Sequence, residues 1–519
     1  MIPVAPSPRW QVRAAGIVAV VVFLGLVARF WHPVYGFTAL FQLDASNDGV
    51  KIAAFRELPV YVHRDTGGYD GLYYAQIAQD PTLRDPALPP AMDNFAYRAR
   101  RILPPALAWV LGAGQPAAII HTYALLNVAA WLALAAVLWR LLEVRDLRGW
   151  IAWAGVLFSA GALGSVRLAL TDLVALGILA GALLAAECGR GRLAAAGLAA
   201  AGLARETALL AVAGLCQSPW FSKKNVARGL VVAVPLGAWL AYVRWRAGPA
   251  DQGWSNFTWP GTGLLEKWHA VIEALSTVDD RPLAWTTLLA TLGLTVQAAF
   301  FVVRRDPADR WWRIGAAYTG LMLCLGTAVW EGFPGAATRV LLPLSLAFNV
   351  QAHRSRASFA WLLLGNLSVF AGLLTLRDMP SNPREVAALR QSGLAVMATA
   401  GEGWSGREAH GRHAWLWARG QQATVAIETW PKTDAKLRLT FALRSLAPRT
   451  ITILQHGREI GRAEITTTLS RHTVELQVAA GRATAEFYTP AEPVPESQAP
   501  GSRRLAFALY DPELALAKP

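Results

Sequence analysis

Long apolar segments recur through the first 380 residues, and short arginine-bearing loops separate them. Ala117–Trp139 and Leu283–Val303 contain no Asp, Glu, Lys or Arg, and an arginine directly follows each of them. About 20 apolar residues in helical form span the hydrocarbon core of a bilayer. Only 16% of the residues are charged, against roughly 25% in soluble domains. The sequence therefore predicts a polytopic α-helical membrane protein.

The arginines also predict an orientation, because positively charged loops stay on the cytoplasmic side. Arg9 and Arg13 precede Ala14–Ala28, and no small-x-small cleavage site follows, so we expect an uncleaved first span rather than a signal peptide. Residues 32–100 and 246–281 then form two external loops. About ten spans are expected, with the C-terminus outside, and they include 14–28, 117–139, 150–166, 173–187, 226–242, 283–303, 312–330, 340–350 and 359–376.

The segment 193–217 does not fit this alternation. Lys223, Lys224 and Arg228 follow it and also favour the inside, so a single crossing would put them on the wrong face. A split at Arg205-Glu206-Thr207 gives two half-helices of about 18 Å each. We therefore predict a re-entrant helix pair whose polar tip reaches partway across the bilayer.

The first external loop holds a carboxylate between glycines and aromatic residues. In Gly67-Gly68-Tyr69-Asp70-Gly71 the glycines let the backbone turn sharply, and Tyr73 and Tyr74 follow at roughly helical spacing. The local sequence by itself favours a helix cap, in which Asp70 accepts backbone N–H groups. The alternative is a catalytic carboxylate at the start of a helix.

Five charged residues lie in or at the outer ends of apolar segments, where charge is costly and normally faces a protein interior or an aqueous cavity. They are Asp172, Arg205, Glu206, Glu331 and Arg339. The expected topology puts them on the same side as both external loops, which favours one shared outward-facing cavity. The structural alternative is a self-contained pair for Arg205 and Glu206, and ordinary interface positions for Asp172 and Arg339.

A second basic cluster, Tyr97-Arg98-Ala99-Arg100-Arg101, ends the first external loop. Guanidinium groups bind phosphate bidentately, so these arginines are candidates to hold a phosphate at headgroup depth. Anchoring to lipid phosphate explains any single one of them equally well. The net charge of +14 lies mostly in such loops, so membrane lipids rather than nucleic acid are the expected partners.

After about residue 397 the hydrophobic period becomes two, which predicts β-strands. We expect a hairpin turn at His456-Gly457-Arg458-Glu459 and strands at 424–428, 436–442, 450–454, 473–478 and 483–488. Residues 397–519 are thus predicted to form an external β-sandwich behind a linker at 381–396. Four tryptophans of this domain either stack on sugar rings or fill a small core without disulfides: Trp404, Trp415, Trp417 and Trp430.

Four motifs add a resemblance to this picture. They are Tyr69-Asp70-Gly71-x-Tyr73-Tyr74-x-x-Ile77-Ala78-x-Asp80-Pro81, Tyr97-Arg98-x-x-Arg101-Ile102-Leu103-x-Pro105, Ala204-Arg205-Glu206-Thr207 and Thr338-Arg339-Val340-Leu341-Leu342-Pro343. With the long first loop, the bundle and the re-entrant pair, the chain resembles the GT-C superfamily of polyprenyl-phosphate-sugar-dependent glycosyltransferases. It looks most like bacterial membrane proteins assigned to cell-surface glycopolymer formation.

The resemblance implies a GT-C-like domain at 1–380 in a bacterial inner membrane. It also implies inverting transfer of a sugar from a polyprenyl-phosphate donor to a glycopolymer or glycolipid acceptor on the outer face. Asp70 matches the acidic catalytic residue of such enzymes, and we expect it to be the general base. Arg98, Arg101, Arg205 and Arg339 are assigned to the donor phosphate. The supporting residues are Tyr73, Tyr74, Tyr97, Asp172 and Glu206.

Three alternatives accompany this reading. Transfer of a whole oligosaccharide or of another group from a lipid carrier would use the same site. The first external loop lacks the Asp-x-Asp or paired Glu-Asp element of many GT-C enzymes, so no metal ligand is assigned and a divalent metal stays an alternative. A non-catalytic scaffold or transporter for glycopolymer export would also use intramembrane charges. Broken helices in both halves would favour a transporter, whereas the sequence predicts one broken pair. Walker A, dinucleotide-binding, His-Glu-x-x-His and Gly-x-Ser-x-Gly motifs are absent from the sequence.

Overall fold

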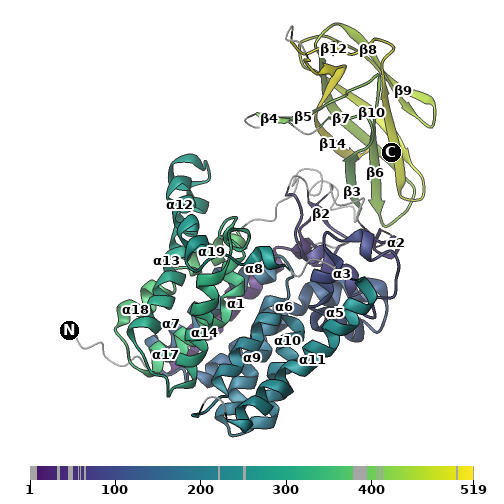
Figure 1. Ribbon diagram of the computed structural model, residues 1–519. Coiled ribbons are helices and arrows are strands. Elements are labelled where there is room, and N and C mark those ends of the chain that lie inside the picture. Colours follow the sequence, from purple (N-terminus) through teal and green to yellow (C-terminus); the bar gives the residue numbers. More distant parts are fainter. Residues whose placement is uncertain are drawn as a thin grey trace. The chain divides into compact units, whose positions relative to one another are not determined.

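The computed structural model describes residues 9–31, 35–44, 51–56, 58, 60–63, 66–219, 222–248, 253–377, 394–405, 408–410, 413–497 and 501–517. The chain divides into a helical unit and a β unit, each compact (Figure 1). The helical unit is Met1–Trp31, Gly36–Tyr61 and Asp65–Met379, and the β unit is His32–Tyr35, Val62–Arg64 and Pro380–Pro519. Most of the linker predicted at 381–396 lies outside the described residues.

The helical unit begins with one long helix and a loop of short elements. These are α1 (Arg9–Ala28), η1 (Thr38–Phe41), the short strand β1 (Leu43–Asp44), α2 (Ala53–Arg56), α3 (Gly71–Ile77), η3 (Pro89–Ala91), α4 (Phe95–Ala99) and α5 (Leu103–Leu111). The short strand β2 (Val62–His63), which follows α2 in sequence, belongs to the β unit. The prolines of this stretch cannot continue a helix interior. The described part of residues 32–100 therefore consists of short elements rather than one regular helix.

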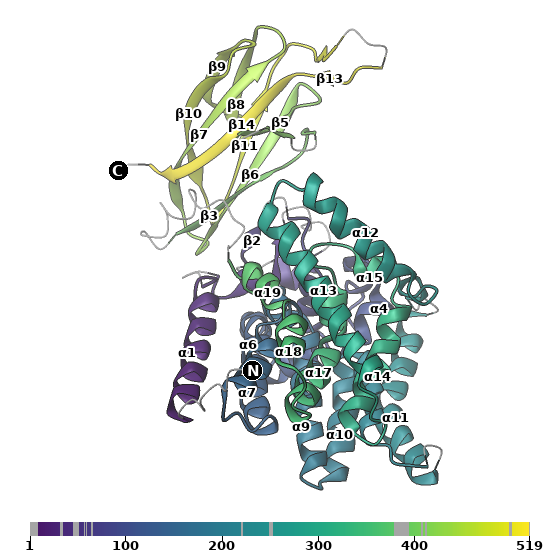
Figure 2. The same ribbon diagram turned by 90° about the vertical axis from the view of Figure 1, so that its left-hand side faces the viewer.

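Helices then pack against one another to make the body of the unit (Figures 1 and 2). They are α6 (Pro116–Leu141), α7 (Leu147–Leu157), α8 (Ala160–Arg167), α9 (Asp172–Glu187), α10 (Gly191–Ala204), η4 (Glu206–Gly214), α11 (Lys223–Ala247), η5 (Trp254–Asn256), α12 (Thr262–Thr277), α13 (Arg281–Val303), α14 (Arg310–Cys324), α15 (Thr327–Trp330), α16 (Ala337–Val340), α17 (Leu342–Arg354), α18 (Phe359–Gly365) and α19 (Val369–Thr375).

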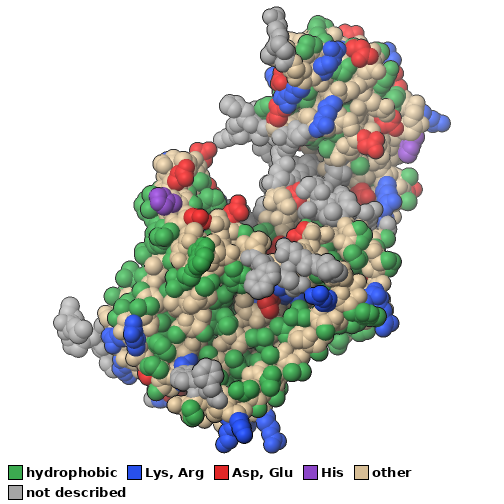
Figure 3. All heavy atoms as spheres, in the orientation of Figure 1, with side chains coloured by type: hydrophobic (Ala, Val, Ile, Leu, Met, Phe, Trp, Pro, Cys, Tyr) green, Lys and Arg blue, Asp and Glu red, His purple; other side chains and the backbone are tan. Residues whose placement is uncertain are grey.

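Within the described residues, four helices are long and apolar enough to cross a membrane: α1, α6, α11 and α13. A fifth span results if α7 and α8, which meet at 41°, are counted as one. Many hydrophobic side chains lie on the face of the helical unit drawn in Figure 3. Helix α11, for example, exposes Leu230 (59%), Val231 (58%) and Val234 (60%). Such a surface is typical of contact with lipid. The expected total of about ten spans stays a prediction.

The expected span at 312–330 is interrupted in the structure. Helix α14 ends at Cys324, Leu325 is extended, and α15 resumes at Thr327. Leu325 forms a β-bridge with Phe257, and the Gly326 N–H donates to Asn256 O at 2.7 Å. Backbone pairing with a distant segment therefore replaces helical hydrogen bonds at this point, which hydrophobicity alone does not reveal.

The break predicted at Arg205 is present. Helix α10 ends at Ala204, Arg205 is extended (φ −153°, ψ 118°), and the 3₁₀ helix η4 starts at Glu206. A Cβ on Gly202 would lie 2.6 Å from Leu209 Cδ2. Because glycine allows this close approach, η4 folds back against α10 as a hairpin.

The β unit contains two five-stranded antiparallel sheets, with strand orders β10-β7-β14-β5-β4 and β3-β6-β11-β8-β9 (Figure 2). The strands are β3 (Ala395–Ala400), β4 (Glu408–His410), β5 (His413–Trp417), β6 (Gln422–Trp430), β7 (Ala435–Ser445), β8 (Arg449–Gln455), β9 (Arg458–Ile465), β10 (Ser470–Val478), β11 (Arg482–Tyr488) and β14 (Phe507–Leu516), and a small ribbon adds β12 (Val494–Pro495) and β13 (Arg504–Leu505).

All five expected strands of the β unit are present, as β6, β7, β8, β10 and β11. The turn between β8 and β9 consists of His456 (φ 50°) and Gly457 (φ 73°), the positive-φ pair that a two-residue hairpin needs. Trp404 (8% exposed) lies in the core cluster and Trp417 (2%) in a smaller one, so these two fill cores. Trp415 stacks on Tyr510 with ring centroids 5.2 Å apart. The Trp430 side chain lies outside the described residues.

Candidate active site

Asp70 occupies the N-cap position of α3, but its side chain makes no capping hydrogen bond. Its Oδ2 instead accepts a hydrogen bond from Arg98 Nη1 at 2.6 Å. Gly67 and Gly68 both have positive φ (71° and 72°), which lets the chain turn into this position. The helix-cap role favoured by the local sequence is therefore not the one the carboxylate takes.

Gly71 attaches the start of α3 to the connection between α8 and α9. A Cβ on Gly71 would lie 2.4 Å from Leu168 O and 3.3 Å from Phe41 O. Only glycine allows both backbones to come this close. The contact places Asp70 beside the chain segment that leads directly into Asp172.

Arg98 is shared between two carboxylates. Besides Asp70, it binds Asp93 with two hydrogen bonds, Nε to Oδ1 at 3.0 Å and Nη2 to Oδ2 at 2.6 Å. Its guanidinium carbon also lies 5.1 Å from the Tyr73 ring centroid. Burial by itself would raise the pKa of Asp93, but the hydrogen bonds and charge of Arg98 outweigh it and hold that pKa below its usual value. Asp93 was not among the site residues expected from the sequence.

Arg101 is fully engaged in a second group. It binds Glu206 through Nε (3.0 Å) and Nη2 (2.8 Å), and it donates to the hydroxyls of Tyr74 (2.7 Å) and Tyr97 (3.0 Å). The side chain is 3% exposed. Arg205 and Glu206 therefore do not form a self-contained pair, because Glu206 is bound to a residue of the first loop.

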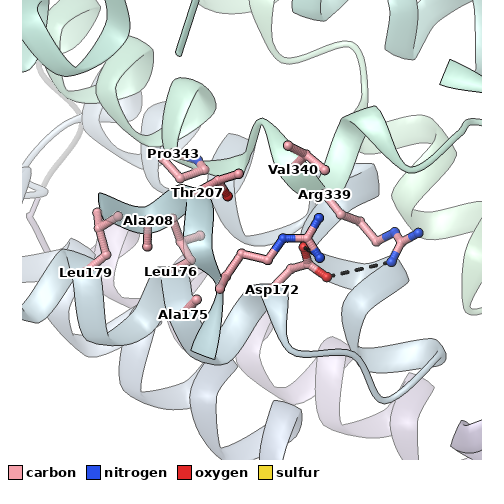
Figure 4. Close-up of a pocket in the computed structure, with 10 residues that line it drawn as sticks. Asp172, Ala175, Leu176, Leu179, Thr207, Ala208, Arg339, Val340 and Pro343 are labelled. Carbon is pink, nitrogen blue, oxygen red and sulfur yellow. Dashed lines mark ion pairs between the residues drawn. The ribbon is translucent and has the colours of Figure 1, made fainter. Parts of the chain in front are cut away.

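Arg205 and Arg339 converge on Asp172 in a third group. Arg205 Nη1 lies 3.1 Å from Asp172 Oδ1, and Arg339 Nη1 lies 3.7 Å from Oδ2. Figure 4 shows the pair formed by Asp172 and Arg339. The Asp172 side chain is 2% exposed, yet among the described residues neither of its oxygens accepts a hydrogen bond, and Arg205 Nε donates none. The pairing is thus electrostatic and leaves guanidinium donors unused.

A small pocket opens beside this third group. Its polar lining is Asp172, Arg205, Thr207 and Arg339, and its apolar lining is Ala175, Leu176, Leu179, Ala208, Val340 and Pro343 (Figure 4). Three of the apolar residues follow Asp172 at helical spacing on α9, so they continue one helix face below the charge. The pocket therefore has a charged end and an apolar wall.

The groups around Arg98, Arg101 and Asp172 lie next to one another, because residues that are consecutive in the sequence belong to different groups. Tyr69, next to Asp70, accepts a hydrogen bond from Arg339 Nη2 at 2.6 Å. Arg205 and Glu206 are consecutive and belong to the third and second groups. The structure thus brings together every residue assigned to the site from the sequence: Asp70, Tyr73, Tyr74, Tyr97, Arg98, Arg101, Asp172, Arg205, Glu206 and Arg339.

Two candidates lie outside these groups, and Tyr69, like Asp93, was not assigned to the site from the sequence. Glu331 is exposed at the end of α15, and it does not line the pocket. The Arg100 guanidinium lies 4.4 Å from the Tyr97 ring centroid. Tyr69 stands in the quoted first-loop motif, but no spacing rule connects it to Arg339. Across the described part of the chain, no group of three or more His, Cys, Asp or Glu side chains is placed to hold a metal ion.

Comparisons with known proteins give weak structural similarities. No protein-family model and no curated protein sequence matches the chain. A family 35 carbohydrate-binding module from Clostridium thermocellum aligns with 23% of this chain and 92% of its own length, at 10% identity and TM-score 0.14. Xyl-CBM35 in complex with a glucuronic acid-containing disaccharide covers 24% of this chain and 98% of its own, at 13% identity and TM-score 0.15.

The arabinosyltransferase EmbB from Mycobacterium smegmatis aligns with 99% of this chain and 66% of its own length, at 12% identity and TM-score 0.36. The chain thus spans about two thirds of that protein. At these scores the similarities carry no argument about activity, and the chemistry of the site is argued from its own residues.

Proposed function

We propose that this chain is a membrane glycosyltransferase. It moves a sugar from a polyprenyl-phosphate donor to a hydroxyl of a cell-surface glycopolymer or glycolipid at the outer face of a bacterial inner membrane. The observation that supports this most is the pocket in which Arg205 and Arg339 stand at the head of an apolar wall. A lipid phosphate has the same two parts, an anionic head and a hydrocarbon chain.

The donor phosphate is assigned to Arg205 and Arg339. Among the described residues, neither guanidinium group hydrogen-bonds to Asp172, and Arg205 Nε donates to no partner. Arg339 Nη2 donates to the Tyr69 hydroxyl, and the N–H groups that face Asp172 are the ones we assign to phosphate oxygens. Arg98 already donates to two carboxylates, and Arg101 donates to one carboxylate and two tyrosine hydroxyls. They are therefore assigned the role of positioning Asp70 and Glu206, rather than direct contact with phosphate.

The first isoprene units are assigned to the apolar wall. Ala175, Leu176 and Leu179 form a continuous face of α9, and Pro343 and Ala208 close it from α17 and η4. A polyprenyl chain can pass from the bilayer to such a surface without exposing its hydrocarbon to water. With the phosphate bound by the arginines and the isoprene units bound by the apolar wall, the sugar–phosphate bond that breaks would lie near Tyr69 and Asp70.

Asp70 is the proposed general base. Arg98 orients the carboxylate through Oδ2, the side chain is 29% exposed, and no described donor binds Oδ1. Oδ1 takes the proton of the acceptor hydroxyl while the hydroxyl oxygen bonds to the anomeric carbon and the carbon–oxygen bond to phosphate breaks. The leaving phosphate gains one negative charge, which Arg205 and Arg339 stabilise. The proton on Asp70 then returns to water.

The test is transfer from defined donors in liposomes. The full chain is reconstituted with a panel of polyprenyl-phosphate hexoses and pentoses and a glycan acceptor, and donor consumption is measured. Asp70→Asn keeps the shape of the side chain and its contact with Arg98 but removes the base. We expect the rate to fall by about 10²–10⁴-fold, the usual contribution of a general base, with little change in the KM for donor.

Two further variants complete the test. Arg339→Gln is expected to raise the KM for donor, because it removes one phosphate ligand. Glu187→Gln removes an ion pair with Arg354 that lies outside the three groups, and it serves as the matched control with an unchanged rate. Transfer by Asp70→Asn at the wild-type rate, with the protein folded, would show that Asp70 is not the base.

A further inference from the structure

Asp172 is unusual because it is buried, charged and without hydrogen bonds. A buried carboxylate normally accepts several hydrogen bonds, which compensate for its lost hydration. Here two arginines lie close by, at 3.1 and 3.7 Å, but neither bonds to it. Asp172 therefore contributes charge to the pocket without occupying the donors of Arg205 or Arg339.

We infer that Asp172 makes this pocket selective for a phosphodiester monoanion over a phosphomonoester dianion. The inference rests on the proposed function, in which the donor is a phosphodiester and the lipid product a phosphomonoester. Two arginines and one carboxylate give the pocket a net charge of +1. A monoanionic diester brings the total to zero, whereas a dianionic monoester leaves an uncompensated charge of −1. Uncompensated charge in an apolar pocket is costly.

The neighbouring groups do not cancel this effect. Arg101 and Glu206 neutralise each other through two hydrogen bonds. Arg98 is shared by Asp70 and Asp93, so that group carries a net charge of −1 and also opposes a second negative charge on the ligand. Tyr69, which accepts from Arg339, is uncharged.

The charge balance gives Asp172 a role in turnover. Before transfer, the ligand charge matches the pocket. Transfer converts the diester into a monoester and adds one negative charge, which the carboxylate repels. Asp172 is thus a positioning and selectivity residue that promotes release of the lipid phosphate product, and it does not contact the reacting carbon.

The test uses two water-soluble probes, dimethylallyl phosphate and its monomethyl ester. At pH 8 the monoester is a dianion, because its second pKa is about 6, and the diester is a monoanion. Dissociation constants are measured by isothermal titration calorimetry on the full chain in detergent micelles. In Asp172→Asn one negative charge is removed at nearly constant shape. The dianion gains twice the electrostatic free energy of the monoanion.

We expect Asp172→Asn to bind the diester about tenfold and the monoester about 100-fold more tightly than wild type, and the tenfold difference between the two gains corresponds to about 1.4 kcal/mol. Asp172→Glu keeps the charge and is expected to keep the wild-type preference. Equal gains for both probes, or equal losses, would mean that Asp172 only shapes the pocket, and would overturn the inference.

The arginine variants distinguish failure of this inference from failure of the proposed function. Arg205→Gln and Arg339→Gln are expected to weaken both probes. If wild type binds neither probe, or if both arginine variants bind them unchanged, the phosphate pocket itself is wrong. If the arginine variants weaken binding while Asp172→Asn leaves the preference unchanged, the pocket stands and only the role of Asp172 fails.

Discussion

Both units have an apolar core, but among the described residues only the helical unit buries ion pairs. The main core cluster of the β unit is apolar throughout, with Phe441, Phe487 and Phe507 in contact at its centre. The helical unit buries Arg101 (3% exposed), Asp172 (4%) and Arg339 (8%) together. Buried ion pairs stabilise a fold weakly compared with apolar residues of similar size. The difference indicates that the charges of the helical unit serve binding and chemistry, whereas the β core serves stability.

The largest effect should come from breaking a charge pair in the helical unit. Arg101→Met removes all partners of the Arg101 guanidinium and leaves Glu206 without its cation. We expect a loss of about 3–5 kcal/mol in the free energy of unfolding of this unit. Hydrogen exchange read by mass spectrometry on the detergent-solubilised chain would measure it.

The double variant Arg101→Met/Glu206→Gln is the control for that experiment. It removes both charges, so most of the lost stability should return. A single variant that loses less than about 1 kcal/mol would contradict the comparison, because the pair would then behave like an exposed one.

A smaller effect is expected in the β core. Ile453 is 1% exposed, and Ile453→Val deletes one buried methylene. We expect the β unit to lose about 0.5–1.5 kcal/mol, read from hydrogen exchange of β8 and β11. Thr452→Ser, on the neighbouring position of the same strand, should stay within about 0.5 kcal/mol of wild type. A loss above about 3 kcal/mol at Ile453 would mean that this core has no capacity to relax.

The smallest effect concerns pH at the edge of the site. The pKa of Asp93 in the folded protein lies below its usual value. The contribution of ionised Asp93 to the free energy of unfolding is therefore complete above about pH 4, and it is lost as the pH falls through the lowered pKa. Its side chain is 45% exposed, so the contribution should stay below about 1 kcal/mol. Amide hydrogen exchange of α4, corrected for the pH dependence of the intrinsic exchange rates, should show this loss of stability at low pH in the wild-type protein. The loss should be absent in Asp93→Asn, and its persistence there would assign it to another carboxylate.

Local patterns made much of the molecule predictable. Alternating residues marked β6, β7, β8, β10 and β11, because a strand with one buried face repeats every two residues. The strands β3, β4, β5, β9 and β14 were not predicted. Charges within apolar segments identified Asp172, Arg205 and Arg339 as site candidates, because isolated charge is costly there. The break at Arg205 also followed from where arginines stand along the chain.

Local sequence patterns, however, could not predict which charged residues pair with one another. Arg101 and Glu206 are 105 residues apart, and Arg339 and Tyr69 are 270 apart. Arginine offers five donors and each carboxylate several acceptors, so many pairings were chemically equal. The helix-cap role of Asp70 was the favoured local reading, and the distant Arg98 took the carboxylate instead.

The sequence by itself determined the inventory: apolar helices, a β unit, and a set of charges that have no place in lipid. Those properties depend on hydrophobicity and periodicity, which act over a few residues. Only the tertiary structure decided that Arg98 and Arg101 hydrogen-bond to carboxylates while Arg205 and Arg339 face Asp172 without hydrogen bonds to it. This difference between the two pairs of arginines depends on where α3, α4, α9, η4 and α16 meet. Packing between segments that are distant in the sequence sets those positions.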